Sequence, residues 1–240
     1  MAIDSQTGAE MLCVRNLHAF YGESHVLHGV DLVVNQGEVV TILGRNGAGR
    51  STTLKSIMGL IDHRSGSITI NGIETIAFQS DKVARCGVGY CPEERGIFAS
   101  LSCEENLLLP PKIAAGGMDL AEIYKVFPNL SERRSSRGTL LSGGEQQMLA
   151  IARILRTGAK LLLLDEISEG LAPVIVQSLA RMIRLLREKG FTVLMVEQNF
   201  RFAAPLADRF YVMEGGRVIE TFTSAQLTSK MEMLHEFLGV

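Results

Sequence analysis

The sequence has no excess of either charge: 24 lysines and arginines stand against 26 aspartates and glutamates, for a formal net charge of −2. A nucleic-acid-binding surface usually shows as a basic excess, so the composition gives no reason to expect a nucleic-acid partner. No apolar run approaches the roughly 20 residues that cross a bilayer as a helix. Residues 1–6 carry neither the basic segment nor the apolar segment of a secretory signal. We therefore expect a cytoplasmic protein without a membrane span of its own.

The cysteines have no metal-site spacing. Cys86 and Cys91 are close in sequence, but no histidine or second cysteine pair accompanies them, so we expect no zinc or redox site. We expect free thiols in a reducing compartment. The remaining composition, 46% hydrophobic and 21% charged residues, is ordinary for a globular protein, and we expect residues 1–240 to form a single domain. The four cysteines are Cys13, Cys86, Cys91 and Cys103.

A glycine-rich turn between a buried strand and a helix is the stretch around which the chain is organised. The apolar run at residues 39–43 predicts the strand, and residues 54–60 predict the helix. Glycines let successive backbone N–H groups point inward, and the helix N-terminus adds partial positive charge, so we expect the turn to bind phosphate. The Ser51 hydroxyl is placed to coordinate a nucleotide-bound Mg²⁺. The turn consists of Gly44, Arg45, Asn46, Gly47, Ala48, Gly49, Arg50, Ser51 and Thr52.

This turn departs from the phosphate-binding pattern G-x-x-x-x-G-K-[ST] at one position, where Arg50 replaces lysine. The positive charge is kept, but a compact ammonium is exchanged for a longer planar guanidinium. We favour nucleotide binding, and the alternative is a plain glycine-rich turn from strand to helix.

The remaining segments predict an α/β fold. An apolar run at residues 160–164, a helix pattern beginning at Pro173 and a strand at residues 191–196 form a βαβ unit, which implies a parallel core sheet with a right-handed crossover. Short helical pieces between about 93 and 157, the last of them from about 142 to 157, predict a helical subdomain. The other expectations are an N-terminal antiparallel β layer with strands at 11–17, 30–34 and 67–70, a hairpin at 210–219, C-terminal helices at about 224–240, and disorder at 1–10.

Asp165 and Glu166 end a predicted parallel strand, at the sheet edge where ligands bind in α/β folds. The phosphate-binding turn opens at that same edge. One carboxylate can hold a hydrated Mg²⁺ while its neighbour polarises a water for attack on a γ-phosphate. The alternative is that Asp165 caps a loop and Glu166 is only solvated.

Residues 141–147, Leu-Ser-Gly-Gly-Glu-Gln-Gln, contain a second candidate anion site, because Ser142, Gly143 and Gly144 open a predicted helix. One nucleotide does not need two such sites in one chain. Two chains arranged head to tail would use the site of one against the phosphate-binding turn of the other, which predicts a dimer with ATP at its interface. The alternative is a helix N-cap followed by a Gly-Gly hinge.

Residues 141–147 resemble the signature motif of the ABC ATPases, and they follow that family's order, after the phosphate-binding turn and before Asp165 and Glu166. The resemblance covers roughly residues 11–240. It implies ATP and Mg²⁺ as ligands and a second ABC ATPase subunit, identical or different. It also implies transmembrane permease subunits as partners, a substrate-binding protein indirectly, and a location on the inner face of the cell membrane.

The resemblance also implies roles for individual residues. Tyr21 lies where the family stacks an aromatic ring on adenine, although a surface tyrosine is the alternative. Glu166 would be the general base, Arg50 would bind the β- and γ-phosphates, and Gln198 would sense the γ-phosphate. The implied Mg²⁺ ligands are Ser51, Glu93 and Asp165, and the residues that would close the site from the second subunit are Ser142, Gly143 and Gly144.

Departures from the family pattern indicate a branch. Glu93 where glutamine is usual, Gln198 where histidine is usual, and residues 170–173 and 237–240 make the chain similar to ATP-binding subunits of branched-chain amino acid importers. Importers of urea and short amides share much of this pattern. A soluble ABC protein of DNA repair or translation fits less well, because the chain has no long coiled-coil insertion and no second ATPase unit.

Other departures bear on turnover. Arg50 replaces lysine, Ile167 replaces a common proline, and Gln198 cannot carry a proton as histidine can. Phosphoryl transfer depends mainly on positioning and charge, and Glu166 is present, so we expect ATP hydrolysis. The alternative is a nucleotide-sensing subunit with little turnover of its own in an asymmetric complex.

Overall fold

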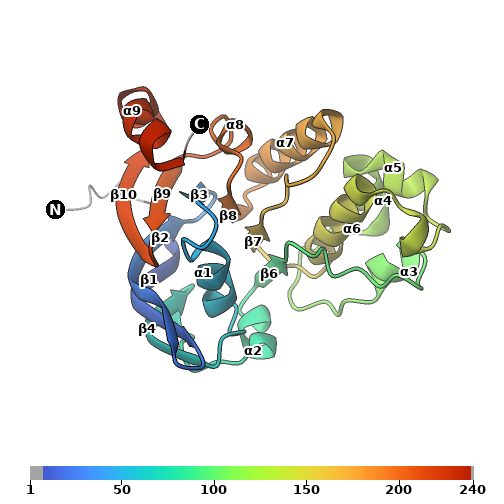
Figure 1. The fold of residues 1–240 in the computed structure, drawn as a ribbon. Helices are drawn as coiled ribbons and strands as arrows, with labels where there is room; N and C mark the ends of the chain where they lie inside the picture. Colours follow the sequence, from blue (N-terminus) through green and yellow to red (C-terminus); the bar gives the residue numbers. More distant parts are fainter. Residues whose placement is uncertain (1–7, 239–240) are drawn as a thin grey trace.

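The computed structural model describes residues 8–238, which form two sheets and the helices around them (Figure 1). The strands are β1 (Glu10–Tyr21), β2 (Ser24–Asn35), β3 (Val39–Gly44), β4 (His63–Ile70), β5 (Ile73–Glu74), β6 (Val88–Cys91), β7 (Leu161–Asp165), β8 (Thr192–Glu197), β9 (Arg209–Glu214) and β10 (Arg217–Thr223). One sheet is antiparallel with the order β2-β1-β4-β5, and the other has six strands in the order β10-β9-β3-β8-β7-β6. The disorder expected at residues 1–10 lies, for residues 1–7, outside the described part of the chain.

The helices pack around the six-stranded sheet or lie beyond its β6 edge (Figure 1). They are α1 (Arg50–Ile57), α2 (Ser80–Arg85), α3 (Cys103–Leu108), α4 (Leu120–Val126), α5 (Pro128–Glu132), α6 (Gly143–Arg156), α7 (Pro173–Glu188), α8 (Phe200–Ala203) and α9 (Leu227–Leu238), with 3₁₀ turns at Gly138–Leu140 and Ser224–Gln226. Figure 1 shows α3 to α6 gathered beyond β6, on the side of the molecule opposite the antiparallel sheet. That these helices form a separate subdomain remains a prediction.

The six-stranded sheet is covered on both faces. On one face, Ile42 and Leu163 pack with Leu54 of α1 and Leu12 of β1 in one buried cluster. On the other face, alternate strand residues pack against α6 and α7 in a second cluster, which includes Leu162, Leu149 and Leu179. A strand buried on both faces has no polar side, which explains the continuous leucine run of β7.

The predicted fold class is confirmed: a parallel core sheet lies beside an antiparallel layer from the N-terminal third. The strands β3, β8, β7 and β6 pair in parallel, β9 joins β3 in parallel, and β10 closes the edge as the expected antiparallel hairpin. The predicted βαβ unit is also confirmed as β7, α7 and β8, and the helix predicted at about 142–157 is α6. The carboxyl ends of β3, β6, β7 and β8 therefore meet at one sheet edge.

Several boundaries predicted from the sequence are wrong. The helix predicted at 54–60 is α1, which begins at Arg50, directly after the left-handed Gly49, and ends at Ile57, shortly before the left-handed Gly59. The strand predicted at 30–34 is only the end of the twelve-residue β2. The short elements β6 and α2 had no prediction, since four to six residues are too few to show a periodicity.

Candidate functional site

The glycine-rich turn connects β3 to α1 at the carboxyl edge of the sheet. Gly47 and Gly49 have φ angles of 81° and 101°, a region that other residues rarely adopt, so the tight turn depends on glycine at these positions. Helix α1 begins without a side-chain cap and has no acidic residue in its first turn. Its first N–H groups and its positive end therefore have no anionic side chain of their own helix to neutralise them.

The turn surrounds a cavity of about 300 Å³. Three carboxylates from other parts of the chain complete its wall, namely Glu93 from the loop after β6 and Glu166 and Glu169 from the loop after β7. The structure thus brings together most of the residues expected from the sequence at a phosphate site. The lining residues from the turn are Arg45, Asn46, Gly47, Ala48, Gly49, Arg50, Ser51 and Thr52, and Gly44 is the buried end of β3 just before them.

Arg50 is buried, with 4% of its side chain exposed, and forms an ion pair with Glu166. Its Nη2 donates to the Glu166 carboxylate, and also to the Asn46 side-chain oxygen at 3.4 Å. Its other terminal nitrogen, Nη1, is buried and has no partner. A buried guanidinium with an unpaired donor needs a further acceptor, and an anion in the cavity would supply one.

Asp165 is held by two hydroxyl groups. The Ser51 hydroxyl donates to Oδ1 at 2.8 Å, and the Tyr90 hydroxyl donates to Oδ2 at 2.9 Å. Burial raises the pKa of Asp165, while these hydrogen bonds favour its ionised form and oppose the rise. Burial and the neighbouring Asp165 charge raise the pKa of Tyr90, so this phenol stays a donor. The first residue of the acidic pair is therefore connected directly to the phosphate-binding turn.

Glu166 lies at a bend in the chain, with a φ angle of 46°. Its backbone N–H donates to the Val196 carbonyl at 3.0 Å, which anchors the bend to β8. A hydrogen bond with Glu166, together with burial and the Glu166 charge, raises the pKa of Glu169. Arg50 therefore holds the Glu166 side chain, and Glu169 lies beside it in the wall of both cavities.

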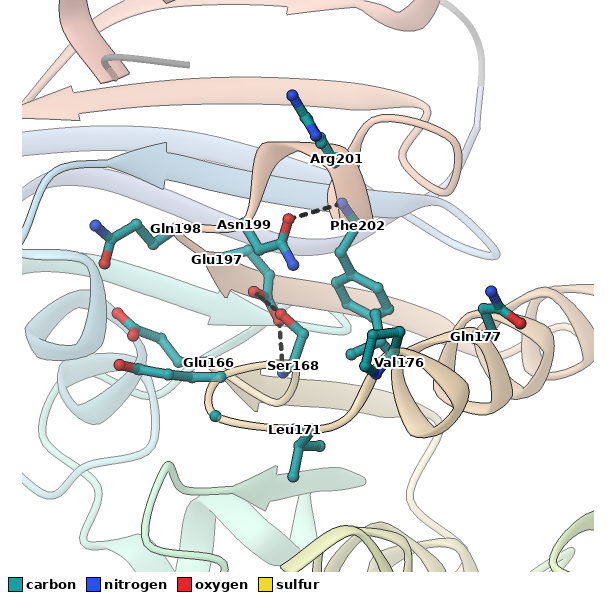
Figure 2. Close-up of a pocket in the computed structure, with 13 residues that line it drawn as sticks. Glu166, Ser168, Leu171, Val176, Gln177, Glu197, Gln198, Asn199, Arg201 and Phe202 are labelled. Atoms are coloured by element: carbon teal, nitrogen blue, oxygen red, sulfur yellow. Dashed lines mark hydrogen bonds between the residues drawn. The ribbon is translucent and has the colours of Figure 1, made fainter.

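A second cavity, of about 830 Å³, shares Glu166 and Glu169 with the first. Gln198 lines it, and Figure 2 shows Glu166 and Gln198 extending to the same side of this cavity. Two of the dashed lines in Figure 2 mark hydrogen bonds from Ser168 to the Glu197 side chain, one from its hydroxyl and one from its backbone N–H. Burial raises the pKa of Glu197 to about 8.

Gly44 and Asp165 adjoin the first cavity without lining it, and four other predicted site residues line neither cavity. Tyr21 ends β1 with 49% of its surface exposed. Ser142 is the N-cap of α6, and its hydroxyl accepts from the Glu145 N–H at 3.3 Å while the Glu145 carboxylate accepts from the Ser142 N–H. Gly143 and Gly144 follow in the first turn, where a Cβ on Gly144 would lie 2.8 Å from Ile175. The N-cap of the alternative interpretation is therefore real, and a single chain does not bring this segment to the phosphate-binding turn.

Three residues that shape the site had no assigned role in the sequence. Tyr90, Glu169 and Glu197 are near Glu93, Glu166 and Gln198 in the sequence, but a sequence does not show which neighbours turn inward. The position of Glu197 gives a partial signal, because it follows four apolar residues of β8 and ends a strand that is buried along its whole length.

A family model described as ABC transporter matches residues 27–169. The high-affinity branched-chain amino acid transport ATP-binding protein BraG of Pseudomonas aeruginosa is 41% identical over 95% of this chain and 100% of its own. A probable branched-chain amino acid transport ATP-binding protein, LivF of Archaeoglobus fulgidus, is 36% identical over 90% of this chain and 94% of its own. The lipopolysaccharide export system ATP-binding protein LptB of Haemophilus influenzae is 34% identical over 95% of this chain and 97% of its own.

A solved structure agrees with this fold. An ATP-binding cassette in a dimeric post-hydrolysis state, bound to ADP and Pi, matches with a TM-score of 0.77 and 25% identity, over 89% of this chain and 99% of that one. Within residues 8–238 of the present chain, no helix combines the length and hydrophobicity that crossing a bilayer requires.

Proposed function

The chain belongs to the ABC transporter family of ATP-binding proteins, and we propose that it hydrolyses ATP to drive import of branched-chain amino acids. The observation that carries this proposal is the convergence of Arg50, Ser51, Asp165 and Glu166 at the mouth of the glycine-rich turn. A cation, a hydroxyl and two carboxylates at one sheet edge are the groups that phosphoryl transfer requires.

The phosphates of ATP fit the first cavity. Backbone N–H groups of the turn and the uncapped start of α1 would bind phosphate oxygens, and Arg50 Nη1 offers a buried donor without a partner. The pairing of Arg50 with Glu166 leaves that donor free for the anion. Replacement of lysine by Arg50 therefore leaves the phosphate site with a positive charge.

Mg²⁺ would be held jointly by the nucleotide and by few protein oxygens. Among residues 8–238, no three His, Cys, Asp or Glu side chains are arranged to bind a metal ion by themselves. Ser51 and Asp165, already 2.8 Å apart, and Glu93 in the same cavity are the candidate ligands. Such a site suits Mg²⁺, which keeps phosphate and water oxygens in its shell, and the bound ion neutralises charge on the phosphates.

Glu166 is the candidate general base. Its carboxylate would accept a proton from water as the water oxygen bonds to the γ-phosphorus and the bond from that phosphorus to the bridging oxygen breaks. Gln198, on the same side of the second cavity, would donate a hydrogen bond to the γ-phosphate or orient the water. The products are ADP and inorganic phosphate.

A second ATPase subunit would complete the site. Ser142, Gly143 and Gly144 do not line the cavity of their own chain, so they are available to a nucleotide held by a partner. Tyr21, half exposed at the end of β1, is the candidate stacking surface for adenine.

Transmembrane permease subunits are the proposed partners, and this chain would bind them at the inner face of the cell membrane, with a substrate-binding protein acting through them. The likeness to BraG and LivF favours branched-chain amino acids as the imported solutes. The test is uptake by proteoliposomes that contain the chain, its membrane partners and the substrate-binding protein. ATP-dependent uptake of leucine, competed by valine and isoleucine but not by urea, is the expected result. Uptake of urea instead would assign the chain to an amide importer, and hydrolysis without uptake of either would contradict the proposal.

A nucleotide-sensing subunit with little turnover is the second candidate, and the Arg50–Glu166 ion pair is the observation that favours it. If Arg50 also covered the second carboxylate oxygen of Glu166 with ATP bound, it would withhold the general base from water. Hydrolysis that is unchanged in Glu166→Gln and depends on a partner subunit would support this candidate.

A further inference from the structure

The two ends of the Arg50 guanidinium have different surroundings. Nη2 is engaged by the Glu166 carboxylate and by the Asn46 oxygen, whereas Nη1 is buried with no partner. The side chains of Arg50 and Glu166 are only 4% and 10% exposed, so water does little to satisfy or loosen this pair. The planar group therefore has one occupied donor end and one free donor end.

The chemistry of arginine gives this asymmetry a use. A guanidinium is planar, is always charged and presents separate N–H donors in a rigid fork, so it can hold two anions at a fixed separation. A lysine ammonium in the same position is a single point with a flexible stem. It would have to serve a phosphate and a carboxylate from one nitrogen, and it would not fix the direction between them.

We propose that Arg50 positions the general base as well as binding phosphate: Nη2 holds the Glu166 carboxylate while Nη1 binds the terminal phosphate. This inference rests on the proposed function, since it concerns the same site. It makes Arg50 the member that fixes Glu166 relative to the γ-phosphorus. Arginine at position 50 would therefore hold the general base as well as the phosphate, which lysine would not do.

The other groups around Glu166 agree with this role. Glu169 lies beside Glu166 in the wall of both cavities, and its backbone N–H donates to the Glu166 carbonyl at 3.3 Å. The left-handed backbone at Glu166 and the bond from its N–H to Val196 fix where its side chain begins. Arg50 is the group that connects this arrangement to the phosphate-binding turn.

The test is a double-mutant cycle of the natural chain, Arg50→Lys, Glu166→Gln and the double variant. Its first readout is thermal unfolding without nucleotide. Arg50→Lys should lower the melting temperature in the natural background. It should change the melting temperature much less in Glu166→Gln, because that variant has already lost the ion pair. Additive shifts would show that the two side chains do not interact and would overturn the inference.

The second readout is the binding and hydrolysis of Mg-ATP. Titration calorimetry measures the affinity, and phosphate release measures the turnover. We expect Arg50→Lys to bind Mg-ATP within about fivefold of the natural chain, since the charge remains, but to hydrolyse it about ten- to a hundredfold more slowly, since the base is misplaced. Turnover equal to or faster than that of the natural chain would overturn the inference. Arg85→Lys, at an exposed position of α2, is the matched control and should change neither readout.

Failure of the inference and failure of the proposed function give different results. A natural chain that binds no Mg-ATP contradicts the proposed function, whereas fast turnover of Arg50→Lys contradicts only the positioning role. If Arg50→Lys does not fold, Glu166→Asp takes its place, because it keeps the charge and withdraws the carboxylate from Nη2. It should bind Mg-ATP normally and turn over about tenfold more slowly, and normal turnover would contradict the positioning role.

Discussion

Ser168 donates its hydroxyl and its backbone N–H to the two carboxylate oxygens of Glu197, at 2.7 and 3.2 Å. These bonds join the loop that carries Glu166 to the end of β8, directly before Gln198. Glu197 is 1% exposed. The loops that carry the candidate base and the candidate γ-phosphate sensor are therefore joined by hydrogen bonds, and a displacement of either loop would displace the other.

Glu197→Gln should remove a pH dependence of stability. Burial raises the pKa of Glu197 from 4.5 to about 8, so the folded chain binds this proton more tightly than the unfolded chain. Glu197 therefore makes the free energy of unfolding fall as pH rises between those values, by up to about 1.4 kcal/mol per pH unit. Glutamine keeps an acceptor for Ser168 and does not titrate. Chemical denaturation at pH 5.5 and pH 8 measures the difference.

Glu188→Gln is the matched control for this prediction, because Glu188 is exposed at the end of α7. It should keep the pH dependence of the natural chain. Equal pH dependence in the natural chain and Glu197→Gln would show that the Glu197 carboxyl is ionised at neutral pH, against the structural argument from its burial.

Tyr90→Phe should weaken the proposed Mg²⁺ site without disrupting the fold. The Tyr90 hydroxyl donates to Asp165 at 2.9 Å, and its loss leaves the buried carboxylate with the single donor Ser51. The pKa of Asp165 would rise further, and the free energy of unfolding should fall by about 1 kcal/mol. The Mg²⁺ concentration that half-saturates ATP hydrolysis should increase. Tyr124→Phe, which loses a comparable bond to Glu104, should affect stability but not the Mg²⁺ requirement.

Gly144→Ala should destabilise the contact between α6 and α7. An added Cβ would lie 2.8 Å from two carbon atoms of Ile175, and overpacking of this kind costs about 1–3 kcal/mol, less what alanine returns in helix propensity. The melting temperature should fall, and Ile175→Ala in the same chain should restore part of the loss. A melting temperature at or above that of the natural chain would contradict this close packing.

Much of the fold was predictable because its signals are local. The continuous leucines of β7, the turn after β3 and Pro173 at the start of α7 each specify an element and its burial. The same patterns predicted that the phosphate-binding turn and Glu166 meet at one edge, because parallel strands end together. The start of α1 was placed four residues late, since glycine-rich segments carry no helical periodicity.

What the sequence could not predict are side-chain pairings across the site. Arg50 was expected to face phosphate, and its ion pair with Glu166 depends on the bend at Glu166, which no local pattern specifies. Two further hydrogen bonds, from Tyr90 to Asp165 and from Ser168 to Glu197, also join segments that are far apart in the sequence. They depend on which side chains turn inward, and the sequence does not show this.

Steady-state Mg-ATP hydrolysis of the natural chain and of Glu166→Gln, each assembled with its membrane partners, tests the proposed activity most directly. We expect measurable turnover in the natural assembly and a loss of at least about a hundredfold in Glu166→Gln, because general-base catalysis contributes about 10²–10⁴-fold. The variant should still bind Mg-ATP. Equal turnover in the two assemblies would contradict the assignment of Glu166 as the base, and an absence of turnover in the natural assembly would contradict the proposed ATPase.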